Sequence, residues 1–212
     1  MVLDKKVAEQ TVNFLLQINA IKLNTKNPFT WTSGIKSPIY CDNRLILSYP
    51  EVRKFIADNM SEIIKNKYGE NISIAGVATG AIAIGAMIAE KLNLPYAYVR
   101  PKPKSHGLKN QIEGKIQTGS NIVVIEDLIS TGMSSLNAIN ALKSENYKVN
   151  GMLSIFSYNF DFANNKFNDE KILVNSLADY NTLVELIESQ GKLKSYEIVR
   201  LKKWREDPKT WK

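Results

Sequence analysis

Between residues 72 and 190, short apolar runs alternate with segments whose apolar residues recur at helical spacing. No other feature constrains the fold as strongly, since strands separated by helices build a parallel sheet with helices on both faces. The sequence therefore predicts an α/β protein with a central, mainly parallel sheet. We expect strands over residues 72–77, 96–100, 121–126, 149–158 and 171–177, and helices over residues 81–92, 134–145 and 179–190.

The segments that flank this alternation have other patterns. Residues 3–21 and 50–68 carry apolar residues at the spacing of amphipathic helices, and Pro50 suits the first turn of the second. Residues 22–49 contain glycine, proline and aromatic residues, which indicates loops with short extended pieces. The last stretch is expected to be a helix that ends before Pro208. A length of 212 residues suits a single domain, with room for a small subdomain.

The composition limits the classes of partner that the protein can bind. The formal net charge of +7 is compatible with nucleic acid, an acidic membrane surface or small anionic substrates. The sequence has no zinc-finger spacing and no aromatic RNA-binding pattern, and no segment approaches the ~20 apolar residues of a membrane span. The only cysteine, Cys41, is more typical of packing than of a nucleophile and excludes an internal disulfide. We expect a cytoplasmic protein with no nucleic-acid partner and no membrane partner.

Two adjacent acids, Glu126 and Asp127, stand at the C-terminal end of the apolar run Ile122–Ile125. Ligands of open α/β sheets bind beyond this end of the strands. The following Leu128–Ser134 stretch is a Ser/Thr/Gly turn that leads into a helix, where backbone N–H groups and the helix dipole favour a phosphate. Neighbouring carboxylates suit the two hydroxyls of a ribose, or a metal. A solvated N-cap turn is the alternative, but the combined pattern favours a sugar phosphate.

The stretch VVIEDLISTGMSS resembles the phosphoribosyl-pyrophosphate (PRPP) signature of type I phosphoribosyltransferases. The resemblance implies the fold of that family: a central, mainly parallel sheet flanked by helices, with a small N-terminal hood built mainly from residues 1–48. It also implies one phosphoribosyltransferase domain over residues 1–212. The residues that it assigns to the ribose and phosphate of PRPP are Glu126, Asp127, Leu128, Ile129, Ser130, Thr131, Gly132, Met133 and Ser134.

The stretch YVRPKPKSHGLKNQIEGKI resembles the mobile catalytic loop of the orotate phosphoribosyltransferases. The resemblance implies a mobile loop over about residues 101–118 that closes on the pyrophosphate and reaches the neighbouring subunit of a homodimer with shared active sites. It assigns catalytic roles to Arg100, Lys104 and His106, together with Asp127. Pro101 stands where the family often has a lysine, and Lys102 is the candidate replacement.

Two further stretches resemble the same family. FTWTSGIKSPIYCDNR resembles the hood over the pyrimidine, which places Tyr40 and Ser130 against orotate and makes Lys36 and Arg44 candidates to meet anionic groups. GVATGAIAIGA resembles the pyrophosphate loop, with Thr79 and Gly80 facing the leaving group. The family also implies Mg²⁺ as cofactor, held mainly by pyrophosphate and ribose oxygens and not by protein ligands.

The implied function is a transferase reaction of pyrimidine (UMP) biosynthesis. Orotate and PRPP would give orotidine 5′-monophosphate and pyrophosphate. Two alternatives stay open. The acidic pair and its turn are equally compatible with a phosphoribosyltransferase for another base, and the basic charge is compatible with a PRPP-sensing regulator that binds nucleic acid.

Overall fold

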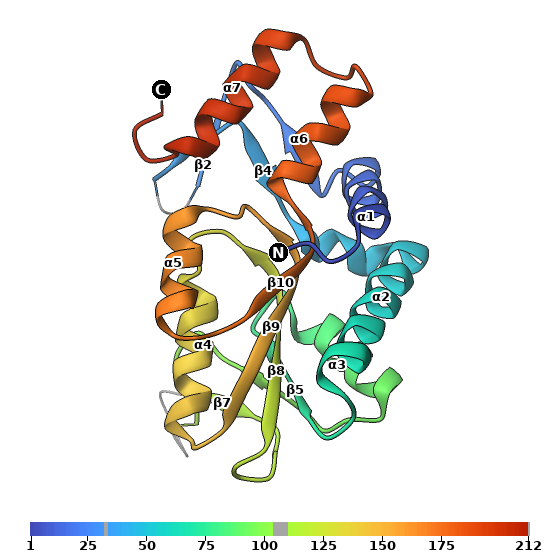
Figure 1. Cartoon of the computed structure of the whole chain (residues 1–212), viewed down its shortest axis with the longest axis vertical. Coiled ribbons are helices and arrows are strands. Elements are labelled where there is room, and N and C mark those ends of the chain that lie inside the picture. The colour runs from blue at the N-terminus through green and yellow to red at the C-terminus, as the bar shows by residue number, and fades with distance from the viewer. Residues whose placement is uncertain (32–33, 104–109, 212) are drawn as a thin grey trace.

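The computed structural model describes residues 1–31, 34–103 and 110–211. Its centre is a six-stranded sheet in the order β10–β9–β8–β5–β6–β7 (Figure 1). Neighbouring strands are parallel except β7, which pairs antiparallel with β6 at the edge of the sheet. The mainly parallel sheet predicted from the alternation is therefore confirmed. The strands are β5 Ser73–Val77, β6 Tyr96–Val99, β7 Ile112–Glu113, β8 Asn121–Ile129, β9 Lys148–Ser157 and β10 Val174–Asp179.

Helices cover both faces of this sheet. In Figure 1, α1 (Lys5–Gln17), α2 (Pro50–Tyr68) and α3 (Ile82–Leu92) lie on one side, and α4 (Met133–Ser144) and α5 (Asp161–Asp169) lie on the other. Strand β8 supplies side chains to both sides in alternation, because successive residues of a strand point to opposite faces. Val123 and Ile125 belong to the core shared with α1–α3, whereas Ile122 and Val124 belong to the core shared with α4.

A smaller unit stands beyond the C-terminal ends of the strands. Strand β1 (Ile21–Leu23) pairs antiparallel with β4 (Ile39–Cys41), β2 (Phe29–Thr30) pairs with β3 (Lys36–Ser37), and the short helix η1 (Asn43–Ser48) follows. We call residues 21–48 the hood. Helices α6 (Tyr180–Ser189) and α7 (Ser195–Glu206) lie at the same end of the molecule (Figure 1).

Trp204 of α7 joins the hood to the sheet. Its side chain is fully buried, and its Nε1 donates a hydrogen bond to the main-chain oxygen of Lys36 at 2.9 Å. Its ring lies 5.7 Å from the ring of Trp31 in the hood and 5.7 Å from that of Tyr158, which follows β9. Aromatic packing of this kind buries a large apolar area. One side chain of α7 therefore connects both walls of the space beneath the hood.

The structure departs from the sequence expectations at several places. Strand β7 lies in the segment that was expected to be a loop, and the helix expected over residues 3–21 spans Lys5–Gln17. Helix α5 was not predicted, because Ala163 and Phe167 are its only buried residues and, apart from Phe162, the rest of its sequence is polar. Strand β8 continues to Ile129, beyond the expected end at residue 126, since it keeps pairing with β9. Strand β10 starts at Val174, three residues later than expected. Among the described helices, none is long and apolar enough to cross a membrane.

Candidate active site

The turn after β8, at Ser130–Ser134, leads into the N-terminus of α4, and we call it the phosphate turn. Gly132 has φ of 76° there, and a Cβ on it would lie 3.1 Å from the ring of Phe167 on α5. No side chain in the described part of the chain caps the helix, so the first-turn amides of α4 are available to an anion. Ser130 and Thr131 are half-buried, and Met133 and Ser134 are exposed at the opening of the turn. This is the arrangement expected for binding a phosphate.

The two acids have different surroundings, because β8 continues through both and their side chains point to opposite faces. Glu126 is 3% exposed and points towards α4. One of its carboxylate oxygens accepts from Ser135 Oγ at 2.8 Å, and the other accepts from the Asp127 N–H at 3.1 Å. Burial, and then the nearby charge of Asp127, raise the pKa of the Glu126 carboxyl well above its usual range. Glu126 is thus placed to hold the turn through Ser135, and neither this role nor Ser135 was predicted from the sequence.

Asp127 is half-buried and points to the other face, where the turn between β5 and α3 carries the predicted pyrophosphate loop. A Cβ on Gly80 would overlap the Asp127 carboxylate, so the acid packs directly on the glycine. Thr79, the other predicted loop residue, is exposed. The structure therefore brings Asp127 and Gly80 together, as expected if one ligand is to contact both.

Tyr96 of β6 supports this loop from beneath. Its hydroxyl donates to the main-chain oxygen of Ile82, the first residue of α3, at 2.7 Å. A Cβ on Gly76 would lie 2.6 Å from the same hydroxyl, so the strand before the loop needs glycine at this position. Burial raises the pKa of Tyr96 above its usual range, which keeps the phenol a donor. Sequence reasoning had not identified Tyr96, because a tyrosine in a strand is ordinarily a packing residue.

A cavity of about 510 Å³ lies between the hood and the phosphate turn. Tyr40 and Ser130, the two residues expected to meet orotate, both line it. Tyr40 is 39% exposed, and its ring lies 5.7 Å from that of Phe29. The flat aromatic walls suit a planar base. The described residues that line it are Thr30, Trp31, Tyr40, Cys41, Leu128, Ser130, Thr131 and Tyr158, of which Thr30, Trp31, Cys41 and Tyr158 were not predicted as site residues.

Arg100 and Lys102 lie on the far side of the phosphate turn. Both line a second cavity, of about 330 Å³, together with Ser134 of α4 and Ala78 of the turn between β5 and α3. We call this turn, which carries Gly80 and the predicted pyrophosphate site, the glycine loop. The Arg100 guanidinium lies 3.4 Å from Glu113 Oε1 across the β6–β7 pair. Two cations thus stand beside the predicted pyrophosphate loop. Lys104 and His106, the other predicted catalytic residues of this segment, lie outside the described residues.

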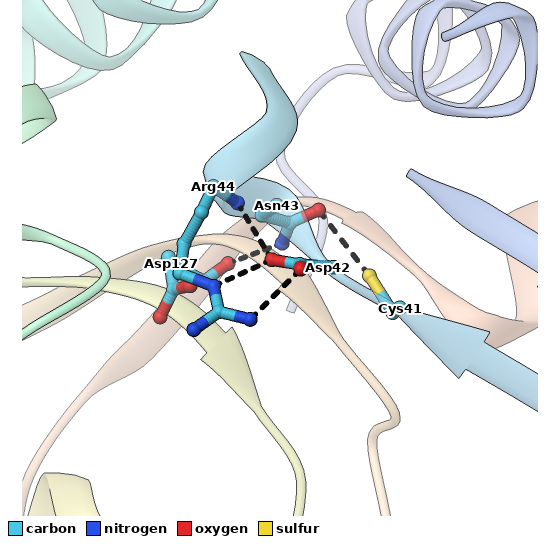
Figure 2. A network of polar contacts seen from close by, with 5 residues as sticks. All are labelled: Cys41, Asp42, Asn43, Arg44 and Asp127. Atoms are coloured by element: carbon cyan, nitrogen blue, oxygen red, sulfur yellow. Dashed lines mark hydrogen bonds and ion pairs between the residues drawn. The ribbon is translucent and has the colours of Figure 1, made fainter. Parts of the chain in front are cut away.

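Lys36 and Arg44 differ in their distance from this site. Lys36 is exposed on β3 and does not line the base cavity, so the structure does not bring it to Tyr40 and Ser130. Arg44 lies near Asp127 but makes two hydrogen bonds to Asp42, of 2.6 and 2.8 Å (Figure 2). These bonds hold the pKa of the Asp42 carboxyl below its usual value and raise that of Arg44.

Asn43 completes the same network in Figure 2. Its Nδ2 donates to the main-chain oxygen of Asp127 at 2.6 Å, and its Oδ1 accepts from the Cys41 thiol at 3.2 Å. Burial raises the pKa of that thiol well above its usual value, so Cys41 is a thiol donor and not a thiolate. Asn43 was not predicted, since it lies 84 residues from its partner in the sequence.

This fold, with an acid, a phosphate turn and a glycine loop at the carboxyl ends of the strands, defines a phosphoribosyltransferase. Residues 45–159 match the family described as phosphoribosyl transferase domain. An orotate phosphoribosyltransferase of Phocaeicola vulgatus is 47% identical over 209 residues, which cover 99% of this chain and 97% of that protein. Another, of Lactococcus lactis subsp. cremoris, is 47% identical over 93% of this chain and 94% of its own. The chain belongs to the orotate phosphoribosyltransferases.

Solved structures agree with this assignment. The orotate phosphoribosyltransferase of Aeropyrum pernix is 28% identical and superposes with a TM-score of 0.74, covering 86% of this chain and 99% of that chain. The Mycobacterium tuberculosis enzyme in complex with 5-phospho-alpha-D-ribosyl 1-diphosphate is 20% identical, with a TM-score of 0.64 over 84% of this chain and 98% of that chain. At that identity the likeness shows the fold alone. The predicted family and fold are thus confirmed.

Proposed function

We propose that the chain transfers the 5-phosphoribosyl group of PRPP to a ring nitrogen of orotate, giving orotidine 5′-monophosphate and pyrophosphate in UMP biosynthesis. It is then a glycosyltransferase of the pentosyl class. The observation that carries the proposal is the cavity of about 510 Å³ that joins Tyr40 of the hood to Ser130 of the phosphate turn. A planar base in this cavity would lie next to a sugar phosphate bound at the turn.

The reaction needs orientation and charge stabilisation more than a side-chain nucleophile. The orotate nitrogen attacks the anomeric carbon as pyrophosphate departs, and positive charge builds on the ribose, as in glycoside chemistry. Asp127 would bind the ribose hydroxyls, and the amides and hydroxyls of Ser130–Ser134 would bind the 5-phosphate. These contacts to a non-reacting group supply binding energy that fixes the reacting atoms.

The leaving group carries most of the negative charge. The amides of Thr79 and Gly80, with Arg100 and Lys102, would stabilise that charge as it develops. From the family resemblance, Lys104 and His106 would act from the loop, His106 as a proton donor to the departing pyrophosphate. Closure of this loop would exclude water, which otherwise hydrolyses PRPP.

Mg²⁺ is proposed as the cofactor. In the described residues there is no group of three or more His, Cys, Asp or Glu side chains that would hold a metal ion. One carboxylate, that of Asp127 on β8, packs against Gly80 of the predicted pyrophosphate loop. Mg²⁺ is typically held by few protein ligands together with substrate oxygens, so this site fits the ion if ribose and pyrophosphate supply most of its ligands. The ion would neutralise charge on the pyrophosphate.

Loss of orotate absorbance in the ultraviolet tests the function. Protein, PRPP, Mg²⁺ and orotate are mixed, with uracil, hypoxanthine and metal-free samples as controls. We expect loss that requires both PRPP and Mg²⁺ and disappears with Asp127→Asn. Turnover with another base but not with orotate would retain the ribose-phosphate site and refute the base assignment. Salt-dependent nucleic-acid binding without turnover of any base would favour the regulator.

A homodimer with shared active sites is part of the proposal and comes from the resemblance of the 98–116 segment to a loop that acts in the neighbouring subunit. Lys104→Ala and Asp127→Asn, each inactive alone, should recover part of the activity when they form mixed dimers. Verified mixed dimers without recovery would refute a shared site. The cytoplasmic location stays a prediction.

A further inference from the structure

The side chain of Asn43 connects the hood to the strand that carries Asp127. Asn43 is the first residue of η1 and is 1% exposed. Its amide is used at both ends, since Nδ2 donates to the main-chain oxygen of Asp127 and Oδ1 accepts from the Cys41 thiol. An amide with a defined donor and a defined acceptor partner has only one orientation that satisfies both. The contact is therefore directional.

Asn43 holds Asp127 at a part of β8 that no longer pairs with β5. The pairing of β5 with β8 ends at Gly76 opposite Ile125, so β8 extends past its neighbour before it reaches Asp127. The Asp127 N–H donates to Glu126 Oε1 at 3.1 Å, and its carbonyl accepts from Asn43 at 2.6 Å. Side chains thus hold the backbone of Asp127 on both sides of its Cα.

Small movements of this backbone would reach the site directly. The Asp127 carboxylate packs on Gly80 with no room for a Cβ between them. A shift of the Asp127 main chain would therefore move the acid relative to the glycine loop. Misplacement of a catalytic group by about 1 Å costs on the order of 100-fold in rate.

We propose that Asn43 is a positioning residue for phosphoribosyl transfer, which sets the backbone of Asp127 and through it the carboxylate that binds the ribose. Because Asn43 is also bonded to Cys41, which lines the base cavity, one amide joins the base cavity to the ribose acid. The inference rests on the proposed function, since that function gives Asp127 its substrate.

A buried asparagine with two hydrogen bonds also contributes to stability wherever it stands. Asn175 on β10 provides a control that is matched in residue type and burial. It is 2% exposed, its Oδ1 accepts from Lys67 Nζ at 3.2 Å, and its Nδ2 makes no hydrogen bond to the described residues. It lines neither of the two cavities of the candidate site. Asn175→Ala should therefore lower stability while it changes kcat by less than about threefold.

The test is a double-mutant cycle with orotate, PRPP and Mg²⁺, at a temperature below the unfolding transition of every variant. Asn43→Ala removes the amide, and Asn43→Leu removes it while keeping a similar volume. Both should lower kcat by about 10- to 100-fold in the wild-type background. Because Asp127→Asn is expected to be inactive, the two backgrounds are compared through the Kd of PRPP with Mg²⁺. Asn43→Ala and Asn43→Leu should weaken PRPP binding while Asp127 is present and change it by less than about threefold in Asp127→Asn, since the group that Asn43 positions is already lost.

Two results would overturn the proposal. One is a loss with Asn43→Ala no larger than that with Asn175→Ala. The other is a weakening of PRPP binding by the same factor with and without Asp127, which would mark Asn43 as a structural residue only. If the wild type does not turn over orotate, the proposed function fails by itself. The Kd of PRPP with Mg²⁺ then still tests the inference by itself, because Asn43→Ala should weaken binding only while Asp127 is present.

Discussion

Gly80 and Asp127 lie so close that a methyl group on the glycine would overlap the carboxylate. The contact joins the loop after β5 to strand β8. Gly80→Ala should therefore displace the acid without disturbing the core, because Gly80 is only half-buried. We expect kcat/KM for PRPP to fall by about 100-fold, with little change in the melting temperature. Wild-type kinetics in a variant that is shown to be folded would contradict the functional reading of this contact.

The buried carboxyl of Glu126 should make stability depend on pH. Its pKa is raised in the folded state, so the unfolded chain releases this proton at lower pH than the folded protein does. The contribution of Glu126 to stability is therefore full below its unfolded pKa of about 4.3 and is lost as pH rises through the folded value. Glu126→Gln removes this titration.

The measurement is urea unfolding of the wild type and of Glu126→Gln from pH 4 upwards. We expect the free energy of unfolding of the wild type to fall relative to that of the variant as the pH rises. The sign is decisive: a wild type that gains on the variant with rising pH would mean that the folded state favours the charged carboxylate.

The Tyr96 hydroxyl should stabilise the first turn of α3. Tyr96→Phe removes the hydrogen bond to the Ile82 carbonyl and should lower the free energy of unfolding by about 1 kcal/mol. Tyr98 on the same strand is a matched control, since its hydroxyl makes no hydrogen bond to the described residues. Chemical denaturation of Tyr96→Phe and Tyr98→Phe checks the expectation. Equal decreases in the free energy of unfolding would show that the hydrogen bond to α3 does not add to stability.

Trp204 should determine how well the hood is held. Trp204→Phe keeps an aromatic ring but loses the bond from Nε1 to Lys36 and part of the contact with Trp31 and Tyr158. Trp31 and Tyr158 line the base cavity, whereas neither they nor Trp204 line the cavity beside the pyrophosphate loop. The KM for orotate should therefore rise several-fold more than the KM for PRPP. Steady-state kinetics with each substrate varied in turn measure both KM values. An equal rise in the two would contradict the expectation that Trp204 affects the base cavity more than the PRPP site.

The sheet and most of its helices could be predicted from the sequence because their apolar patterns are dense. Ile122–Ile125 is apolar at every position, as expected for a strand buried on both faces. Helix α5 has too few buried positions to produce such a pattern. The antiparallel edge strand β7 has only two residues, Ile112 and Glu113, and lies in a segment whose charge and prolines indicated a loop.

The candidate site was predictable to the extent that local motifs define it. The phosphate turn and the glycine loop are continuous in sequence, and each leads into a helix that the spacing had indicated. The different positions of Glu126 and Asp127 were not predictable, because they depend on β8 continuing past both residues. Asn43, Tyr158 and Trp204 act through partners far away in the sequence, and a single sequence contains no signal for such pairs.

The position of Trp204 near the C-terminus also affects the order in which the structural units can form during synthesis. Every strand of the six-stranded sheet, together with the turn at Ser130–Ser134, precedes α7 in the chain. On the ribosome, where folding proceeds from the N-terminus, the sugar-phosphate half can thus form first. The hood is braced only when Trp204 emerges. The nascent chain would then pass through a stage that can hold PRPP before it can select a base.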